Sequence, residues 1–174
     1  MNERYIRQTM IPEIGEAGQE KLKNAKVLIV GIGGLGSPIS LYLTAAGVGQ
    51  IGLIDDDIVS KSNLQRQILY TEAEIGQSKV ECACRRLSAL NSSTRFETYP
   101  NRFTPDNANR LVSAYDIIVD GCDNAATRYL IDDVCSRFKK PYVYGSISDF
   151  RGQVSVFNYL SLIHISEPTR QAEI

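Results

Sequence analysis

The feature that most constrains the fold of this chain is a glycine-rich turn between an apolar run and a helical pattern. Residues 27–30 (VLIV) are continuously apolar, which is typical of a strand buried on both faces. Residues 37–46 have apolar side chains at helical spacing and end at Gly47. Between these two segments lie Gly31, Gly33, Gly34 and Gly36. This order predicts a strand, a tight turn and a helix.

A second strand and a carboxylate complete the pattern of a nucleotide-binding unit. Residues 51–54 are again apolar, and Asp55, Asp56 and Asp57 follow them directly. In such units the glycines let the backbone approach a phosphate, the helix N-terminus offers free N–H groups, and the acid binds ribose hydroxyls. A lone GxGxxG motif also fits a tight turn that binds nothing. The complete order favours nucleotide binding, but it does not name the nucleotide.

The composition is that of a single folded domain. The chain has 174 residues, of which 43% are hydrophobic and 22% charged, and its formal net charge is -1. This balance gives no electrostatic reason to expect nucleic acid or a membrane surface as a partner. No signal peptide, membrane-spanning run or CxxC pair is recognisable in the sequence. We therefore expect a protein of the reducing cytoplasm.

The rest of the chain alternates between helical and strand patterns. Helices are expected at residues 4–8, 18–23, 76–91, 104–114 and 125–138, and further strands at 95–99, 115–120, 142–146 and 152–158. The last strand alternates in a way that suits a half-buried, antiparallel strand. These elements predict an α/β fold with a Rossmann-like, mostly parallel sheet and helices on both faces.

Two local details of this prediction concern helix faces and caps. In the helix expected at residues 76–91, the buried face should contain Val80, Cys84, Leu87 and Leu90, with Ser78 as the N-cap. The polar segment 57–70 has no sustained period and carries Ser62 and Asn63, which are typical helix-capping residues. It is long for a loop in a compact α/β unit, and such loops are often functional.

Polar residues gather at the predicted carboxyl ends of the strands, where doubly wound sheets bind ligands. Besides the glycines and Asp55–Asp57, these residues are Asn63, Gln65, Arg66, Lys79, Asp120, Asp123 and Asn124. Spacing alone makes Lys79 a surface lysine, and each of the others can be read as a solvated or capping residue. A nucleoside triphosphate carries about four negative charges, so it needs cations and a carboxylate for Mg²⁺. Arg66 and Lys79 could supply the cations, and Asp123 the metal ligand.

At these residues the sequence resembles the E1-like adenylyltransferases of the ThiF/MoeB/HesA type. The motifs follow the order and spacing of that family from about residue 3 to residue 158. They are RYIRQ (4–8), VLIVGIGGLGSP (27–38), AGVGQIGLIDDD (46–57), SNLQRQ (62–67), GQSKV (76–80), DGCDNAATR (120–128) and GQVSVF (152–157).

The resemblance implies an enzyme that binds Mg·ATP and adenylates the C-terminal glycine carboxylate of a ubiquitin-like sulfur carrier ending in Gly-Gly, with release of diphosphate. By resemblance, Gly34 contacts the phosphate region and Asp55 holds the ribose hydroxyls. Asn63, Arg66 and Lys79 approach the phosphates. Asp123 ligates Mg²⁺, with Asn124 beside it. Arg7 matches an arginine that reaches the ATP site of a partner subunit, so a homodimer is implied.

The chain is shorter than the full-length members of that family. The missing part would contain further strands, most of the antiparallel extension of the sheet and, in many members, paired CxxC zinc motifs. Zinc is therefore expected in full-length members but not here, and whether this truncated chain is active stays open. Cys84 is interpreted as a core residue and Cys122 as a small residue in a tight turn. A truncated sheet would also leave apolar surface exposed.

Residues 1–159 are thus predicted to form one truncated adenylation domain. Residues 160–174, which contain the only histidine, His164, do not follow the preceding pattern and are interpreted as a non-native or disordered tail. The pathway is thiamine or molybdopterin synthesis, with a weak preference for thiamine. The alternatives are an NAD(P)-binding oxidoreductase, a non-catalytic fragment that serves as a partner surface, and an ATP-dependent relative that acts on a tRNA base.

Overall fold

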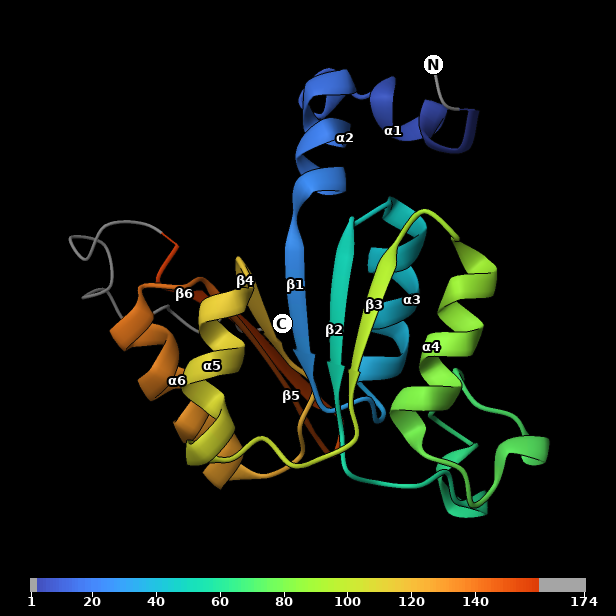
Figure 1. Cartoon of the computed structure of the whole chain (residues 1–174), viewed down its shortest axis with the longest axis vertical. Helices are drawn as coiled ribbons and strands as arrows, with labels where there is room; N and C mark the ends of the chain where they lie inside the picture. Colours follow the sequence, from blue (N-terminus) through green and yellow to red (C-terminus); the bar gives the residue numbers. More distant parts are fainter. Residues whose placement is uncertain (1–2, 160–174) are drawn as a thin grey trace.

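The computed structural model describes residues 3–159, which form a six-stranded sheet with helices on both faces (Figure 1). The strand order is β3-β2-β1-β4-β5-β6, in which β1 to β5 are parallel and β6 is antiparallel to β5. The strands are β1 (Lys26–Val30), β2 (Gln50–Ile54), β3 (Arg95–Tyr99), β4 (Ile117–Asp120), β5 (Tyr142–Ser148) and β6 (Arg151–Phe157). The predicted Rossmann-like, mostly parallel sheet is confirmed.

The helices alternate with the strands, as the sequence predicts. They are α1 (Ile6–Thr9), α2 (Gly15–Asn24), α3 (Gly36–Ala46), α4 (Lys79–Leu90), α5 (Pro105–Ala114) and α6 (Ala125–Phe138). Short 3-10 helices occur at Glu3–Tyr5 (η1), Lys61–Asn63 (η2) and Glu72–Glu74 (η3). No helix within residues 3–159 is long and apolar enough to cross a membrane.

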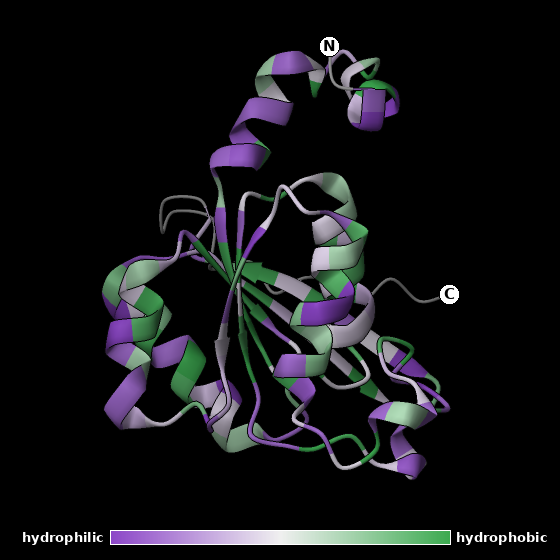
Figure 2. Cartoon of the chain, turned by 45° about the vertical axis from the view of Figure 1, so that its right-hand side comes forward, coloured by the Kyte–Doolittle hydropathy of each residue, from purple (hydrophilic) through white to green (hydrophobic). Residues whose placement is uncertain are grey.

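Two apolar layers hold the helices against the sheet. On one face, alternate residues of the inner strands, such as Ile29 and Leu53, pack with α4 and with partly buried side chains of α3. On the other face, Leu28 and Ile118 pack with α5 and α6. Figure 2 shows the apolar strands between these helices, with the hydrophilic helix α2 beyond the sheet. Burial on both faces explains why the strands read as apolar runs.

The first glycine turn is held by close backbone contacts between three glycines. Gly31 has φ +86, and a Cβ built on it would lie 2.8 Å from the carbonyl carbon of Gly121. A Cβ on Gly36 or Gly121 would collide with the carbonyl oxygen of Gly31. Glycine at these positions therefore lets the end of β1, the start of α3 and the end of β4 meet.

Three local predictions are wrong. Helix α4 begins at Lys79 rather than residue 76, although Ser78 is its N-cap residue as expected, without a side-chain cap hydrogen bond. Leu90, in its last turn, is 37% exposed rather than part of the buried face. The half-buried face expected for β6 is also not found within residues 3–159, where β6 is the outermost strand of the sheet and most of its residues are exposed.

The cap expected at Ser62 and Asn63 is also different. Helix η2 begins after Ser60, whose N–H donates to Asn63 Oδ1 at 3.4 Å in a capping box. Asn63 therefore caps the helix from its third position, and Ser62 is not the cap residue. The prediction for residues 160–174, including His164, lies outside the described part of the chain.

Candidate functional site

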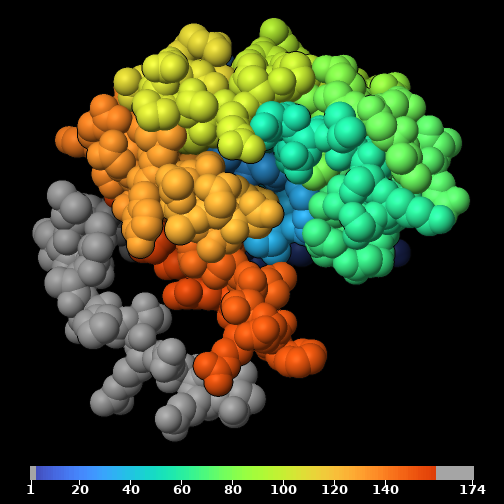
Figure 3. Space-filling model, turned by 90° about the horizontal axis from the view of Figure 1, so that it is seen from below, coloured from blue at the N-terminus to red at the C-terminus, as the bar shows by residue number. Residues whose placement is uncertain are grey.

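A cavity of about 1080 Å³ opens at the carboxyl ends of the parallel strands. Figure 3 looks onto this edge of the molecule and shows the glycine turn at the bottom of a hollow, between the segment after β2 and the segments after β3 and β4. Most of the predicted site residues line it: Gly31, Gly33, Gly34, Asp55, Asp57, Asn63, Arg66, Lys79, Asp123 and Asn124. Residues far apart in the sequence meet here because parallel strands end at the same edge of a sheet.

Asp55 ties the second strand to the glycine turn. Its Oδ2 accepts a hydrogen bond from the N–H of Ile32 at 2.7 Å, and its Oδ1 accepts from the N–H of Asp57 at 2.9 Å. Each carboxylate oxygen has a further lone pair, so the group can still accept from a ligand hydroxyl. Asp55 therefore sets the shape of the turn and keeps accepting capacity toward the cavity.

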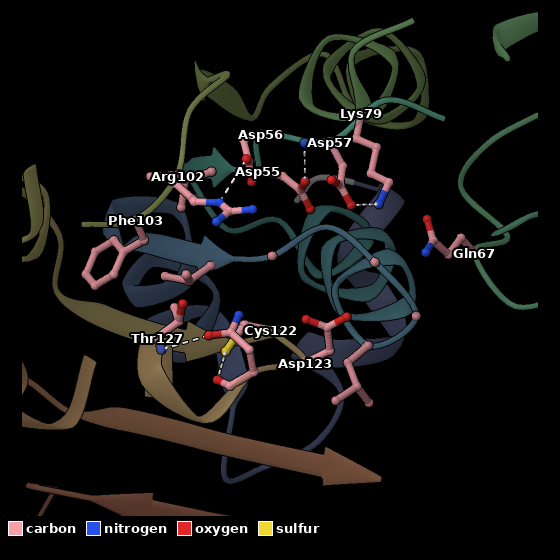
Figure 4. A pocket seen from close by; sticks show the side chains of 18 of the residues that line it. Asp55, Asp56, Asp57, Gln67, Lys79, Arg102, Phe103, Cys122, Asp123 and Thr127 are labelled. Atoms are coloured by element: carbon pink, nitrogen blue, oxygen red, sulfur yellow. Dashed lines mark hydrogen bonds and ion pairs between the residues drawn. The ribbon is translucent and has the colours of Figure 1, made fainter. Parts of the chain in front are cut away.

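Two cations lie on the side of the cavity next to the 57–70 segment. Lys79 is only 4% exposed, and its Nζ lies 2.8 Å from Asp57 Oδ2 (Figure 4). The interpretation of Lys79 as a surface lysine is wrong, because the loop after β2 folds over the start of α4. Arg66 lies against Gly34, where a built Cβ would be 3.6 Å from Arg66 Cδ. Its guanidinium donates to the Ser62 carbonyl at 3.3 Å.

The opposite side of the cavity is formed by the turn between β4 and α6. Asn124 is the N-cap of α6, and its Oδ1 accepts from the N–H of Thr127 at 2.9 Å. Asp123 is exposed, and within residues 3–159 no hydrogen bond or ion pair engages its carboxylate. Figure 4 shows Asp123 across the glycine turn from Asp57 and Lys79. A carboxylate without a protein partner is thus available to a cation or ligand in the cavity.

Below this turn lies a buried polar cluster. Asp120 is fully buried, and its Oδ2 lies 3.2 Å from Arg128 Nε and accepts from the Tyr142 hydroxyl at 3.1 Å. Arg128 also donates to the carbonyl of Cys122 at 2.8 Å. Burial, together with the hydrogen bond to Asp120, raises the pKa of the Cys122 thiol to about 12. Cys122 is therefore a neutral thiol in a tight turn and a poor nucleophile.

Several lining residues were missed by the sequence analysis. Arg102 and Phe103 follow β3, and Arg102 Nε lies 3.0 Å from Oδ2 of Asp56, which belongs to the acidic run already named in the sequence analysis (Figure 4). The weak pattern of β3 gave little reason to look at the residues that follow it. Gln67 also lines the cavity, and only its position in the 57–70 segment could have indicated it.

Three predicted site residues do not line the cavity. Gly36 lies behind the turn, where its contact with Gly31 is a packing contact. Gln65 is exposed and does not line the cavity, whereas Gln67, two residues later, does. Arg7 is an exposed residue of α1, which lies at the opposite, amino end of the sheet (Figure 1). Within one chain Arg7 is remote from the site.

The strand order, the glycine turn and the acid after β2 define an α/β protein of the nucleotide-binding class. Comparison with known families gives a more specific assignment. The chain matches the ThiF family over residues 5–171 and belongs to that family. The family resemblance predicted from the motifs is thereby confirmed, and the oxidoreductase alternative is not favoured.

The relatives of this chain are named as adenylyltransferases. It is 48% identical over 160 residues to a "sulfur carrier protein adenylyltransferase" of Thermus thermophilus, an alignment that covers 92% of this chain and 59% of that protein. It is 51% identical over 154 residues to the "probable adenylyltransferase/sulfurtransferase MoeZ" of Mycobacterium tuberculosis, covering 88% of this chain and 39% of MoeZ. The chain thus spans about half the length of these curated relatives.

The fold also matches solved structures. The crystal structure of E. coli MccB with ATP superposes with a TM-score of 0.74 and 32% sequence identity. The match covers 84% of this chain and 45% of MccB. This chain therefore shares its fold with a part of MccB, whose structure was solved with ATP.

Proposed function

We propose that this chain supplies the adenylation site of an ATP-dependent adenylyltransferase. Its substrate would be the C-terminal glycine carboxylate of a ubiquitin-like sulfur carrier ending in Gly-Gly, in thiamine or molybdopterin synthesis. The observation that supports this most directly is a single cavity in which Lys79, Arg66 and Asp123 surround the glycine turn. The names of the relatives, sulfur carrier protein adenylyltransferase and MoeZ, agree with this substrate class.

The proposed reaction requires alignment and charge neutralisation rather than proton transfer. A carboxylate oxygen of the carrier attacks the α-phosphorus of ATP, the bond from that phosphorus to the bridging oxygen breaks, and diphosphate leaves with the electron pair. The attacking group is already anionic, so no general base is needed. Lys79 and Arg66 would hold the phosphates in place and stabilise charge that develops on the leaving diphosphate.

The residues present fit a magnesium ion as part of this site. The Asp123 carboxylate has no partner within residues 3–159, and carboxylate oxygens are preferred Mg²⁺ ligands. Carboxylate oxygens of Asp55, Asp56 and Asp57 also lie within 4.8 Å of one another on the facing side of the cavity. We propose Asp123 as the magnesium ligand, and the bound ion would neutralise phosphate charge.

The site is proposed to be completed by a second copy of the chain. Arg7 lies at the amino end of the sheet, so it can contribute to a cavity only in a partner subunit. A homodimer in which α1 of one subunit reaches the cavity of the other would add a third cation to each site.

Diphosphate exchange tests the proposed activity. The protein is incubated with ATP, Mg²⁺, labelled diphosphate and a carrier ending in Gly-Gly, and the label entering ATP is measured. Exchange should require Mg²⁺ and should stop when the carrier lacks its final two glycines. Enhancement of NADH fluorescence would support an oxidoreductase instead. ATP binding without exchange in the presence of carrier would support a non-catalytic module. The neighbouring genes would identify the carrier.

A further inference from the structure

A closed set of contacts fixes the backbone directly before Asp123. The N–H of Cys122 donates to Asp120 Oδ1 at 2.8 Å, and the carbonyl of Cys122 accepts from Arg128 Nη2 at 2.8 Å. The two side chains that make these contacts are themselves paired, with Arg128 Nε 3.2 Å from Asp120 Oδ2. Both backbone polar groups of Cys122 are therefore held, and its carbonyl belongs to the peptide that joins it to Asp123.

The backbone after Asp123 is fixed as well. The side chain of Asn124 accepts from the N–H of Thr127 at 2.9 Å and caps helix α6. The Asp123 carboxylate itself is exposed and has no hydrogen-bond or ion-pair partner among residues 3–159. A carboxylate that is free while its backbone is fixed loses little freedom when it binds a cation, which favours binding.

Stability alone is a poor explanation for the pair of Asp120 and Arg128. Asp120 is fully buried and the side chain of Arg128 is 24% exposed, so removal from water offsets much of their attraction. Arg128 also lies in the first turn of α6, where the helix dipole disfavours a cation. What the planar, forked guanidinium does provide is geometry, because it reaches Asp120 and the Cys122 carbonyl together.

We infer that Arg128 is a positioning residue for the Asp123 carboxylate. This inference rests on the proposed function, in which Asp123 is the magnesium ligand, and it names the group that holds this ligand in place. Arg128 would act through the peptide between Cys122 and Asp123 and not by contact with the metal or the nucleotide. Replacing residues that orient metal ligands typically changes metal affinity by about 10- to 100-fold.

The test measures how much Mg²⁺ strengthens nucleotide binding. Calorimetry gives the Kd of a non-hydrolysable ATP analogue in EDTA and in excess Mg²⁺, and the ratio of these two values is the magnesium enhancement. Arg128→Lys keeps a cation beside Asp120, but an ammonium group lacks the planar fork. Its magnesium enhancement should be about tenfold lower than that of wild type, while its Kd in EDTA stays within about twofold.

The matched control is Tyr142→Phe. This substitution removes a different hydrogen bond of the same buried cluster, from the Tyr142 hydroxyl to Asp120 Oδ2 at 3.1 Å, and leaves both contacts to Cys122. Its magnesium enhancement should stay within about twofold of wild type. The double variant Asp123→Ala/Arg128→Lys should have the enhancement of Asp123→Ala alone, because Arg128 acts through that carboxylate.

A second variant, Asp120→Asn, keeps the shape of the side chain and removes the charge that anchors Arg128. It should lower the magnesium enhancement in the same direction as Arg128→Lys. Folding of every variant is checked by circular dichroism and by the Kd in EDTA. Asp120→Asn decides the question if Arg128→Lys does not fold.

Any of four results would overturn the inference: a wild-type protein without magnesium enhancement, an unchanged enhancement in folded Arg128→Lys, an equal loss in Tyr142→Phe, or a further loss in the double variant. Weaker binding of Arg128→Lys in EDTA would make Arg128 a nucleotide contact instead. Diphosphate exchange is measured separately. An enhancement that depends on Asp123 and Arg128 without exchange would reject the proposed adenylation alone. Exchange with an unchanged enhancement in Arg128→Lys would reject only the role of Arg128.

Discussion

Lys79 is buried at a position that disfavours a cation in two ways. It is the first residue of α4, where the helix dipole is positive, and removal from water penalises its charge. The carboxylate of Asp57, at 2.8 Å, offsets part of this cost. Burial of an ammonium group beside a glycine turn is understandable if the group meets an anionic ligand in the cavity.

Asp123 is the residue whose loss should affect the metal requirement most. Asp123→Ala should abolish Mg²⁺-dependent diphosphate exchange, because the remaining cations cannot replace a bound metal. The free energy of unfolding should stay within about 0.5 kcal/mol of wild type, since Asp123 is exposed. Exchange rates across a magnesium titration and urea melts measure the two effects.

A suitable control for this substitution is Asp132→Ala, which removes an exposed carboxylate of α6 outside the cavity lining. It should leave exchange unchanged. If Asp123→Ala exchanges diphosphate at close to the wild-type rate, the metal ligand must be another residue.

Arg66 should contribute to phosphate binding through charge-assisted hydrogen bonds. Arg66→Ala should weaken transition-state stabilisation by about 1.5–3 kcal/mol for each such bond, which is about 10- to 150-fold in kcat/KM for ATP. Arg86→Ala, an exposed arginine of α4 outside the cavity lining, is the control. Unchanged ATP affinity and rate in Arg66→Ala would remove Arg66 from the site.

At the scale of elements, the glycine turn contains one glycine that is needed for packing, Gly36, and one that lines the cavity, Gly34. A Cβ on Gly36 would collide with the carbonyl oxygen of Gly31, whereas a Cβ on Gly34 meets Arg66 side-chain atoms no closer than 3.6 Å. Gly36→Ala should therefore lower the free energy of unfolding by about 1–3 kcal/mol, the usual effect of overpacking. Urea denaturation measures this change.

Gly34→Ala is the matched comparison because it adds the same methyl group two residues away. Its free energy of unfolding should stay close to wild type, while ATP binding weakens because the methyl group enters the cavity. Equal stability losses in both variants would contradict the separate roles given to these two glycines.

The hairpin of β5 and β6 shows that the position of a strand in the sheet affects whether its apolar side chains are buried or exposed. Ile147, Phe150 and Val154 are exposed there, although the sequence pattern suits a strand with one buried face. The alternating pattern of apolar and polar residues shows which side chains share a face of the strand. Those side chains become buried only if another layer of the protein packs on that face. Within residues 3–159, β6 forms the edge of the sheet, and its apolar residues remain largely exposed.

For the whole molecule, the position of Arg7 leads to a test of assembly. Arg7 and the cavity lie at opposite ends of the sheet, so an essential Arg7 must act in a partner subunit. Arg7→Ala and Lys79→Ala should each impair diphosphate exchange. After mixing and subunit exchange, half of the dimers would be mixed with one complete site each, which restores about a quarter of the wild-type rate.

The control mixes two differently labelled preparations of Arg7→Ala, so that subunit exchange between them can be followed. It should remain impaired. If light scattering shows mixed dimers and the Arg7→Ala and Lys79→Ala mixture still lacks exchange, Arg7 does not act across the interface. A monomer with full exchange activity would also exclude this arrangement.

Much of the fold could be predicted because periodicity is a local property of the chain. The apolar run 27–30, the glycine turn and the acid at Asp55 identified the first βαβ unit, and their order predicted the parallel sheet. The site was harder to predict, because the residues that line a cavity depend on how loops fold over the sheet. Gln67 and Gln65 are two residues apart in one polar segment, yet only Gln67 lines the cavity.

The sequence by itself determined the order of strands and helices along the chain, the position of the glycine turn, and membership of the ThiF family. These follow from local backbone preferences and from apolar patterns that admit few arrangements. Only the tertiary structure decided that Lys79 is buried against Asp57, that Asp123 faces the glycine turn without a partner, and that Arg128 holds the carbonyl of Cys122. Burial and pairing depend on neighbours that are distant in the chain and are set when the layers pack together.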